Sequence, residues 1–145
     1  MSFTPQEIAY LASQPLARLA TVAPDGRPDV VPVAFEFDGS GFWVGGSGAS
    51  VLTTRKMRNI LAGHDEVALV VDDMVSFDPF VARGVRVYGV ASAPVERVRL
   101  VGPGTYVRIM PTTSWSWNMN GEPVGDAWYE ARRADHEPPA PEREG

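Results

Sequence analysis

The chain of 145 residues is long enough to form one domain with a substantial hydrophobic core. Its formal net charge of −5 at pH 7 argues against nucleic acid as a partner, because nucleic-acid-binding domains present a basic surface. There is no cysteine, which excludes disulfide bonds, a thiolate nucleophile and a cysteine metal site.

The N-terminal segment predicts a short helix rather than a targeting sequence. Thr4 suits the N-cap, Pro5 the first turn and Glu7 the capping-box position, and Pro15 ends the element. The segment lacks the basic and apolar regions of a signal peptide, and no later apolar run has the length of a membrane span. We therefore expect a cytoplasmic protein without a membrane partner.

Alternating apolar residues then predict a β-meander. Strands are expected over residues 18–22, 28–37 and 42–44, with turns at 24–26 and 38–41. Later strands are expected over 67–71, 84–93, 106–110 and 114–118, with Pro111 as a break. Residues 72–82 are expected to form a loop, and the segment 96–100 is ambiguous.

These elements predict a mainly β protein with short helices. About six or seven mostly antiparallel strands would close into a barrel, because closure removes exposed strand edges. We expect the barrel domain to span residues 1–131. Residues 132–145 are charged, rich in proline and poor in apolar side chains, which predicts a disordered tail.

The stretch VGGSGASVLTTRKMRNI, residues 44–60, predicts a strand, a loop of small residues and a helix that ends at Gly63. The helix start would carry Thr53, Thr54, Arg55, Lys56 and Asn59. A helix N-terminus attracts anions, and Arg55 and Lys56 would add positive charge. Lys56 is the only lysine of the chain, which suggests that a compact charge is needed there. The alternative is a basic helix face that only contacts solvent.

No other pattern predicts a conventional catalytic centre. His64 and His136 are far apart in the sequence, so we expect no metal site. Asp72 and Asp73 could act as an acid and a base, although such pairs more often face solvent or cap a turn. The sequence also lacks dinucleotide-binding, Walker and nucleophile-elbow motifs. If the protein is an enzyme, a bound cofactor would carry the reactivity.

Four segments, in this order, resemble one known family: ARLATVAPDGRPDVVPVAFEFD, FWVGG, TTRKMRNI and RGVRVYGVA. The family is that of the pyridoxamine-5'-phosphate-oxidase-like FMN-binding split barrels. Within it, the sequence is most similar to the small actinobacterial branch of deazaflavin (coenzyme F-420)-dependent reductases, and PTTSWSW resembles the final segment. The resemblance covers roughly residues 5 to 118. It implies an FMN-binding split-barrel fold and a homodimer with cofactor sites at its interface.

The resemblance also implies the positions of a cofactor site. Arg55 and Lys56 would hold the cofactor's phosphate, with Thr53 or Thr54 donating hydrogen bonds and Asn59 nearby. The residues that would line the tricyclic ring are Val31, Pro32, Val33, Ala34 and Phe35. Val44 and Gly45 would flank the ribityl chain, where a missing Cβ permits close approach. A polyglutamate tail, if present, would favour Arg58 or Arg86.

The function implied is hydride transfer from coenzyme F-420 to an unsaturated small-molecule substrate. Tyr88 is the candidate proton donor, and Trp115 and Trp117 are candidates for the substrate pocket. Gly84 stands where pyridoxamine phosphate oxidases carry a glutamine, and their C-terminal Arg-x-His clamp is missing, so pyridoxal phosphate synthesis is not expected. The alternatives are an FMN-dependent flavin reductase or oxidase, and a protein that binds flavin or haem without turnover.

Overall fold

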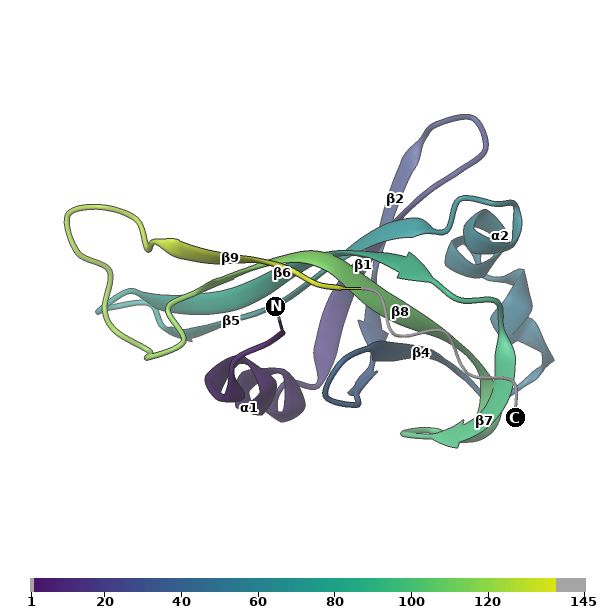
Figure 1. Cartoon of the computed structure of the whole chain (residues 1–145), viewed down its shortest axis with the longest axis horizontal. Coiled ribbons are helices and arrows are strands. Elements are labelled where there is room, and N and C mark those ends of the chain that lie inside the picture. The colour runs from purple at the N-terminus through teal and green to yellow at the C-terminus, as the bar shows by residue number, and fades with distance from the viewer. Residues whose placement is uncertain (1, 138–145) are drawn as a thin grey trace.

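The computed structural model describes residues 2–137, which form one antiparallel sheet with two α-helices (Figure 1). The helical elements are α1 (Pro5–Ser13), the 3-10 helix η1 (Ala49–Thr53) and α2 (Arg55–Leu61). The strands are β1 (Leu16–Val22), β2 (Pro28–Ala34), β3 (Glu36–Phe37), β4 (Phe42–Gly46), β5 (Glu66–Ser76), β6 (Val81–Ala91), β7 (Val95–Arg99), β8 (Gly102–Trp117) and β9 (Ala131–Asp135). No described helix is long and apolar enough to cross a membrane.

The first and last strands of the sheet are connected by a single residue of the chain. The strand order is β2-β1-β5-β6-β8-β4-β3, with β7 and β9 each paired to β8. β2 and β3 stand at opposite ends of this order, yet only Phe35 separates them in the chain. The chain therefore bends at Phe35 and joins the two ends of the sheet into a barrel. The predicted mainly antiparallel barrel with short helices is confirmed.

The prediction of a loop over residues 72–82 is wrong. β5 and β6 continue through this region as a paired hairpin, with Asp73 opposite Arg83 and Ser76 opposite Val81. The Arg83 Nε atom donates to an Asp73 carboxylate oxygen at 2.9 Å, which neutralises a charge that would disfavour the strand. The hairpin extends as an arm beyond α1 (Figure 1).

Pro111 does not break the last long strand, contrary to the prediction. β8 runs continuously past it, and the register with β6 shifts between Tyr88 and Gly89, opposite this position. On the other edge of β8, pairing with β4 reaches Ile109 and pairing with β9 begins at Thr113. Because Pro111 lies in the gap between these two partners and at a bulge, its missing N–H is tolerated.

The predicted domain end at residue 131 is also wrong. Residues 132–135 belong to β9, which pairs with β8 from Thr113 to Trp117, and Ala134 is completely buried. The sequence could not show this, since a short polar strand is ordered by the edge that it joins. The part of the predicted tail from 138 to 145 lies outside the described residues.

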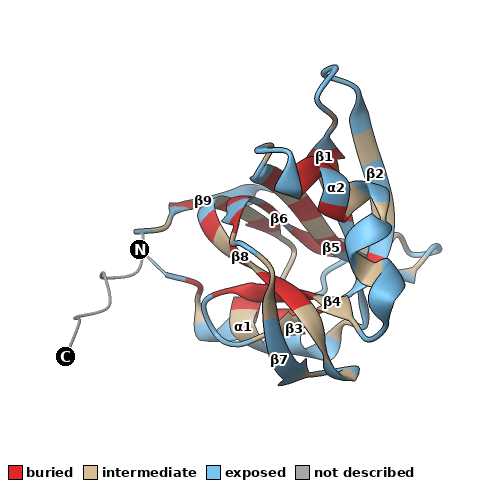
Figure 2. Cartoon of the chain, turned by 90° about the vertical axis from the view of Figure 1, so that its right-hand side faces the viewer, coloured by how far each residue is buried: buried red, intermediate tan, exposed pale blue. Residues whose placement is uncertain are grey.

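The barrel interior is filled by apolar side chains from most strands and from both α-helices. Figure 2 colours the buried residues red along the chain. Phe42 is fully buried and contacts Phe35 and Phe37, with ring centroids at 5.9 and 4.9 Å. Leu11 of α1 and Met57 of α2 are equally buried, so each helix closes part of the barrel. Burial of this apolar surface is the main stabilising term of the fold.

Close contact between β4 and β8 requires glycine. A Cβ atom on Gly45 would lie 2.1 Å from the carbonyl oxygen of Thr105, and one on Gly104 would lie 2.2 Å from that of Gly46. No side chain can occupy such positions without moving the backbone. Gly45 therefore has a packing role between β4 and β8, and its predicted contact with a ribityl chain stays a prediction.

Replacing Gly45 with alanine should lower the free energy of unfolding by about 2–3 kcal/mol, the scale of overpacking in a core. The matched control is Gly125→Ala, because a Cβ at Gly125 meets no atom within 4 Å. Urea denaturation of both variants measures the difference. Equal midpoints for the two variants would contradict the assigned packing role.

Candidate functional site

The basic residues predicted to hold a phosphate lie together on α2 without carboxylate partners. Arg55 and Arg58 are exposed and Lys56 is half-buried. None of the three forms an ion pair with a residue between 2 and 137, whereas six other arginines do. In a chain of net charge −5, these three neighbouring cations give this part of the surface a local positive charge.

The opposite face of α2 fixes the helix to the barrel. Met57 and Ile60 are buried, and the Asn59 amide donates a hydrogen bond of 2.9 Å to the hydroxyl of Thr21 on β1. Asn59 and Thr21 are only 3% and 2% exposed. Asn59 therefore anchors the helix, and its side chain does not face solvent beside the cations.

The two threonines before α2 use their hydroxyl groups locally. The Thr53 hydroxyl donates to the carbonyl of Ser50 at 2.8 Å, and the Thr54 hydroxyl donates to that of Val51 at 2.9 Å. Both bonds stabilise the turn of η1. The hydroxyl protons of Thr53 and Thr54 are thus engaged within the chain, whereas no hydrogen bond to a described residue engages the side chains of Arg55 and Lys56.

The predicted ring-binding segment has two faces. Val33 and Phe35 are 8% and 5% exposed and belong to the core, and Val31 packs against it. Pro32 and Ala34 point the other way and are exposed. Pro32 and Ala34 therefore present their side chains to the surface, whereas Val33 and Phe35 use theirs mainly in the core and Val31 is half-buried.

Val44 and Gly45, the predicted neighbours of the ribityl chain, differ in their surroundings. Val44 is 1% exposed and is part of the core. Gly45 lines a small cavity of about 10 Å³, which it shares with Ala34 and Phe35. Arg99 borders the same space and stacks on Trp43, with its guanidinium carbon 4.2 Å from the ring centroid.

A much larger cavity also contains part of the predicted ring segment. It has a volume of about 620 Å³ and lies between the end of α1, the bend at Phe35 and the turn after β7. Its walls are mainly apolar, with Leu11, Leu16, Ala34 and Leu100 among the lining residues. Small-molecule sites have volumes of this order and a similar apolar lining.

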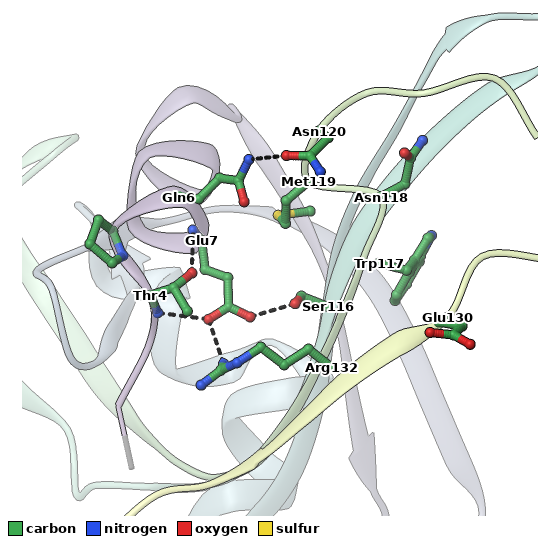
Figure 3. Close-up of a pocket in the computed structure, with 11 residues that line it drawn as sticks. Thr4, Gln6, Glu7, Ser116, Trp117, Asn118, Met119, Asn120, Glu130 and Arg132 are labelled. Carbon is green, nitrogen blue, oxygen red and sulfur yellow. Dashed lines mark hydrogen bonds and ion pairs between the residues drawn. The ribbon is translucent and has the colours of Figure 1, made fainter.

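The predicted pair of pocket tryptophans is separated in the structure. Trp117 lines a cavity of about 440 Å³ between the start of α1, the end of β8 and β9 (Figure 3). Trp115 instead packs on Tyr88, with ring centroids 4.9 Å apart, and on Arg86. The two side chains therefore take part in different environments on β8.

A buried carboxylate that the sequence analysis treated only as a helix cap lies in the wall of the 440 Å³ cavity. Glu7 is 1% exposed and accepts hydrogen bonds from the backbone N–H of Thr4 at 2.8 Å and from the Arg132 Nη1 atom at 2.9 Å (Figure 3). The buried hydroxyl of Ser116 donates a third. Burial alone would raise the pKa of Glu7, but these three donors outweigh it and lower the pKa.

The remaining titratable candidates are engaged in structural contacts. Asp72 pairs with Arg18 at 2.6 Å and Asp73 with Arg83, so they do not form an acid–base pair. His136 is half-buried and forms a 2.8 Å hydrogen bond with Ser114. Within residues 2–137 no group of three side chains is placed to hold a metal ion.

The closed antiparallel barrel with two short helices is the fold of the split barrels. The chain belongs to the family described as pyridoxamine 5'-phosphate oxidase, which matches residues 3–105. The family expected from the sequence segments is therefore confirmed. The fold and the position of α2 are those described above.

Relatives include a reductase. The chain is 39% identical over 125 residues to a 5a,11a-dehydrotetracycline/5a,11a-dehydrooxytetracycline reductase from Streptomyces rimosus, covering 84% of this chain and 87% of that protein. Among solved structures, an F420 reductase matches with a TM-score of 0.59 at 24% identity, covering 77% of this chain and 98% of the other. The protein Rv2991 of Mycobacterium tuberculosis matches with a TM-score of 0.64 at 24% identity, covering 87% and 92%. The two structural matches show the shared fold.

Replacing Glu7 with glutamine should destabilise the protein in a pH-dependent way. Glutamine still suits the capping box. It lacks the negative charge of the carboxylate that accepts hydrogen bonds from Arg132 and Ser116, so the free energy of unfolding should fall by about 2–3 kcal/mol. Since the folded-state pKa of Glu7 is lowered, its contribution is fully present above the unfolded-state pKa near 4.5 and is lost as the pH falls through the folded value.

Denaturant titrations of wild type and Glu7→Gln between pH 3 and pH 7 test this. The stability difference should be largest near neutrality and shrink in acid. A difference that does not change with pH would show that packing, and not the carboxylate charge, is what the substitution removes.

Proposed function

We propose that this protein is an oxidoreductase that binds coenzyme F-420 through α2 and reduces an unsaturated small molecule. The observation that carries the proposal is the group of cations on α2, Arg55, Lys56 and Arg58, which have no carboxylate partner among the described residues. The family match and the reductase relative at 39% identity support the reaction class.

The donor set of α2 fits a phosphate group. Arg55 and Lys56 lie in the first turn of the helix, beside backbone N–H groups that have no carbonyl partner within the helix. A charge-assisted hydrogen bond from either side chain would be short and strong. Asn59 holds this turn against β1, so the cations are positioned before the ligand arrives.

When bound, a reduced deazaflavin supplies a hydride, and the protein supplies orientation and a proton. Tyr88 is the proposed proton donor, because its side chain is 47% exposed and its hydroxyl makes no hydrogen bond to a described residue. A phenol proton delivered to one carbon of a double bond would complete a reduction that begins with hydride addition to the other carbon. The name of the Streptomyces relative directs us to conjugated polycyclic ketones as the substrate class.

FMN is the alternative cofactor. Its phosphate presents the same charge and oxygen atoms to α2, so the cations alone do not select between the two. An FMN-dependent reductase or oxidase would use the same residues. Haem would need an axial ligand, and His136 is not free to serve as one, because it is hydrogen-bonded to Ser114 and its ring centroid lies 4.4 Å from that of Phe3. His64 would be the remaining histidine candidate.

We also propose a homodimer with cofactor sites at its interface. The outer face of the sheet, made by β2, β1, β5 and β6, exposes apolar side chains that nothing in the described chain covers. Val30 is 67% exposed, and Val22, Tyr88 and Val90 are 37%, 47% and 38% exposed. Contiguous apolar surface of this kind is typical of protein interfaces, and a second copy is the proposed occupant.

Lys56→Ala should weaken binding of the cofactor by about 1.5–3 kcal/mol, the scale of a charged hydrogen bond. The melting temperature of the cofactor-free protein should hardly change, because Lys56 makes no ion pair within residues 2–137. Arg97→Ala, which removes an exposed cation from β7, is the control. Loss of stability without cofactor would show instead that Lys56 is structural.

Val30→Glu should convert the dimer into a monomer, since it places a charge in the proposed interface. Val98→Glu is the matched control, because Val98 is 73% exposed on β7, away from that face. Light scattering after size-exclusion chromatography measures the mass. A monomeric wild type, or equal masses for the two variants, would contradict the proposed interface.

A further inference from the structure

Three side chains on the outer face of the sheet form a cluster that includes an arginine without a partner. The guanidinium carbon of Arg86 lies 4.1 Å from the ring centroid of Trp115 and 5.6 Å from that of Tyr88. Arg86 makes neither an ion pair nor a side-chain hydrogen bond with a residue of the described range. Stacking orders the guanidinium but uses none of its N–H donors.

Neighbouring arginines on the same face are already neutralised. Arg18 pairs with Asp72 at 2.6 Å, and Arg133 pairs with Asp135 at 3.1 Å. Arg18 and Arg86 both stand beside Val70 on β5, and Arg133 stands opposite Trp115, so these residues lie in one row across the sheet. Arg86 is the arginine of this row whose positive charge is not offset by a carboxylate of the described chain, so its charge is available to a ligand.

A groove of about 370 Å³ begins beside this cluster. Its floor contains the small side chains Ala20 and Ala68, which lie side by side with Tyr88 on adjacent strands. Val90 and Tyr88 border it on β6. The two small alanine side chains leave room between the larger residues on either side, which suits a planar apolar molecule.

The groove is also electrically asymmetric along the strands. Glu66 lines its far end, opposite Val90, and forms no ion pair with a described residue. Arg86 stands two residues beyond Tyr88 in the other direction, opposite Val70. An anionic group would therefore be repelled from the Glu66 end and attracted to the Arg86 end, which fixes the orientation of the molecule.

We propose that this groove binds a planar aromatic anion, with the ring system over Ala20 and Ala68 and the negative group on Arg86. Identification of this ligand as the substrate rests on the proposed function: an ionised phenol or enol on a conjugated polycyclic ketone has this chemistry. Tyr88 would then contact the ring system. The second copy of the proposed dimer would cover the groove and exclude water.

The probe for this site is 2-naphthoate, with the neutral 2-acetylnaphthalene as its uncharged counterpart. Equilibrium dialysis against the full chain should show that 2-naphthoate binds more tightly than the neutral compound. Arg86→Met keeps the apolar stem and should raise the Kd of 2-naphthoate at least tenfold. Arg97→Met, on β7, should leave it unchanged.

Two further variants separate stacking from charge and guard against misfolding. Trp115→Leu should weaken 2-naphthoate binding by removing the residue that orders Arg86. Arg86→Lys keeps the charge without the planar fork and should restore only part of the affinity. The melting temperature of each variant, measured without ligand, should stay within a few degrees of wild type.

Three results would overturn the proposal. The first is equal binding of the charged and neutral naphthalenes, and the second is an unchanged Kd in Arg86→Met. The third is binding of triglutamate without binding of 2-naphthoate, which would assign Arg86 to a carboxylate chain and not to a planar ligand. Cofactor titration of Arg86→Met keeps the two proposals distinguishable, since an intact α2 site predicts normal cofactor affinity even if the groove proposal fails.

Discussion

The hydrogen bond from Asn59 to Thr21 joins α2 to the barrel, and the arrangement of the basic site depends on it. Both groups are almost fully buried, so loss of either partner would leave the other unsatisfied at a cost of about 1–3 kcal/mol. Met57 and Ile60 add apolar contacts on the same face of the helix. The cations of the first turn are consequently held at the surface by a polar contact inside the barrel.

Arginine serves two purposes in this protein. Six arginines of the described chain are paired with carboxylates, and five of these pairs join different parts of the chain, such as Arg108 with Asp38 and Arg132 with Glu7. The sixth, Arg133 with Asp135, lies within β9. The cations of α2 and Arg86 have no such partner in the described part of the chain. Arg27 and Arg97 also form no ion pair with a described residue, so lack of a partner alone does not mark a ligand site. The two proposed anion sites rest in addition on the grouping of three cations on α2 and on the ordering of Arg86 by Trp115.

Local patterns predicted the architecture because they act over short distances: the alternation in RGVRVYGVA and the glycine after α2 are sufficient for a strand and a helix end. The same reasoning found Arg55 and Lys56, which lie on the polar face of an amphipathic helix. It did not find the role of Asn59, whose partner is 38 residues away. It also missed β9, which has little apolar character and is ordered by pairing with β8. Contacts between distant segments are what the sequence could not show.

The central claim is that α2 holds a phosphate-bearing redox cofactor. The most direct test is a titration of the wild-type protein with oxidised coenzyme F-420 and, separately, with FMN, following tryptophan fluorescence at physiological salt. The account predicts saturable binding of coenzyme F-420 that weakens as salt is raised, because the contact is partly exposed to solvent. Preference for FMN would move the protein to the alternative cofactor at the same site. Absence of binding to both compounds would contradict the account, and α2 would then be only a solvated basic helix.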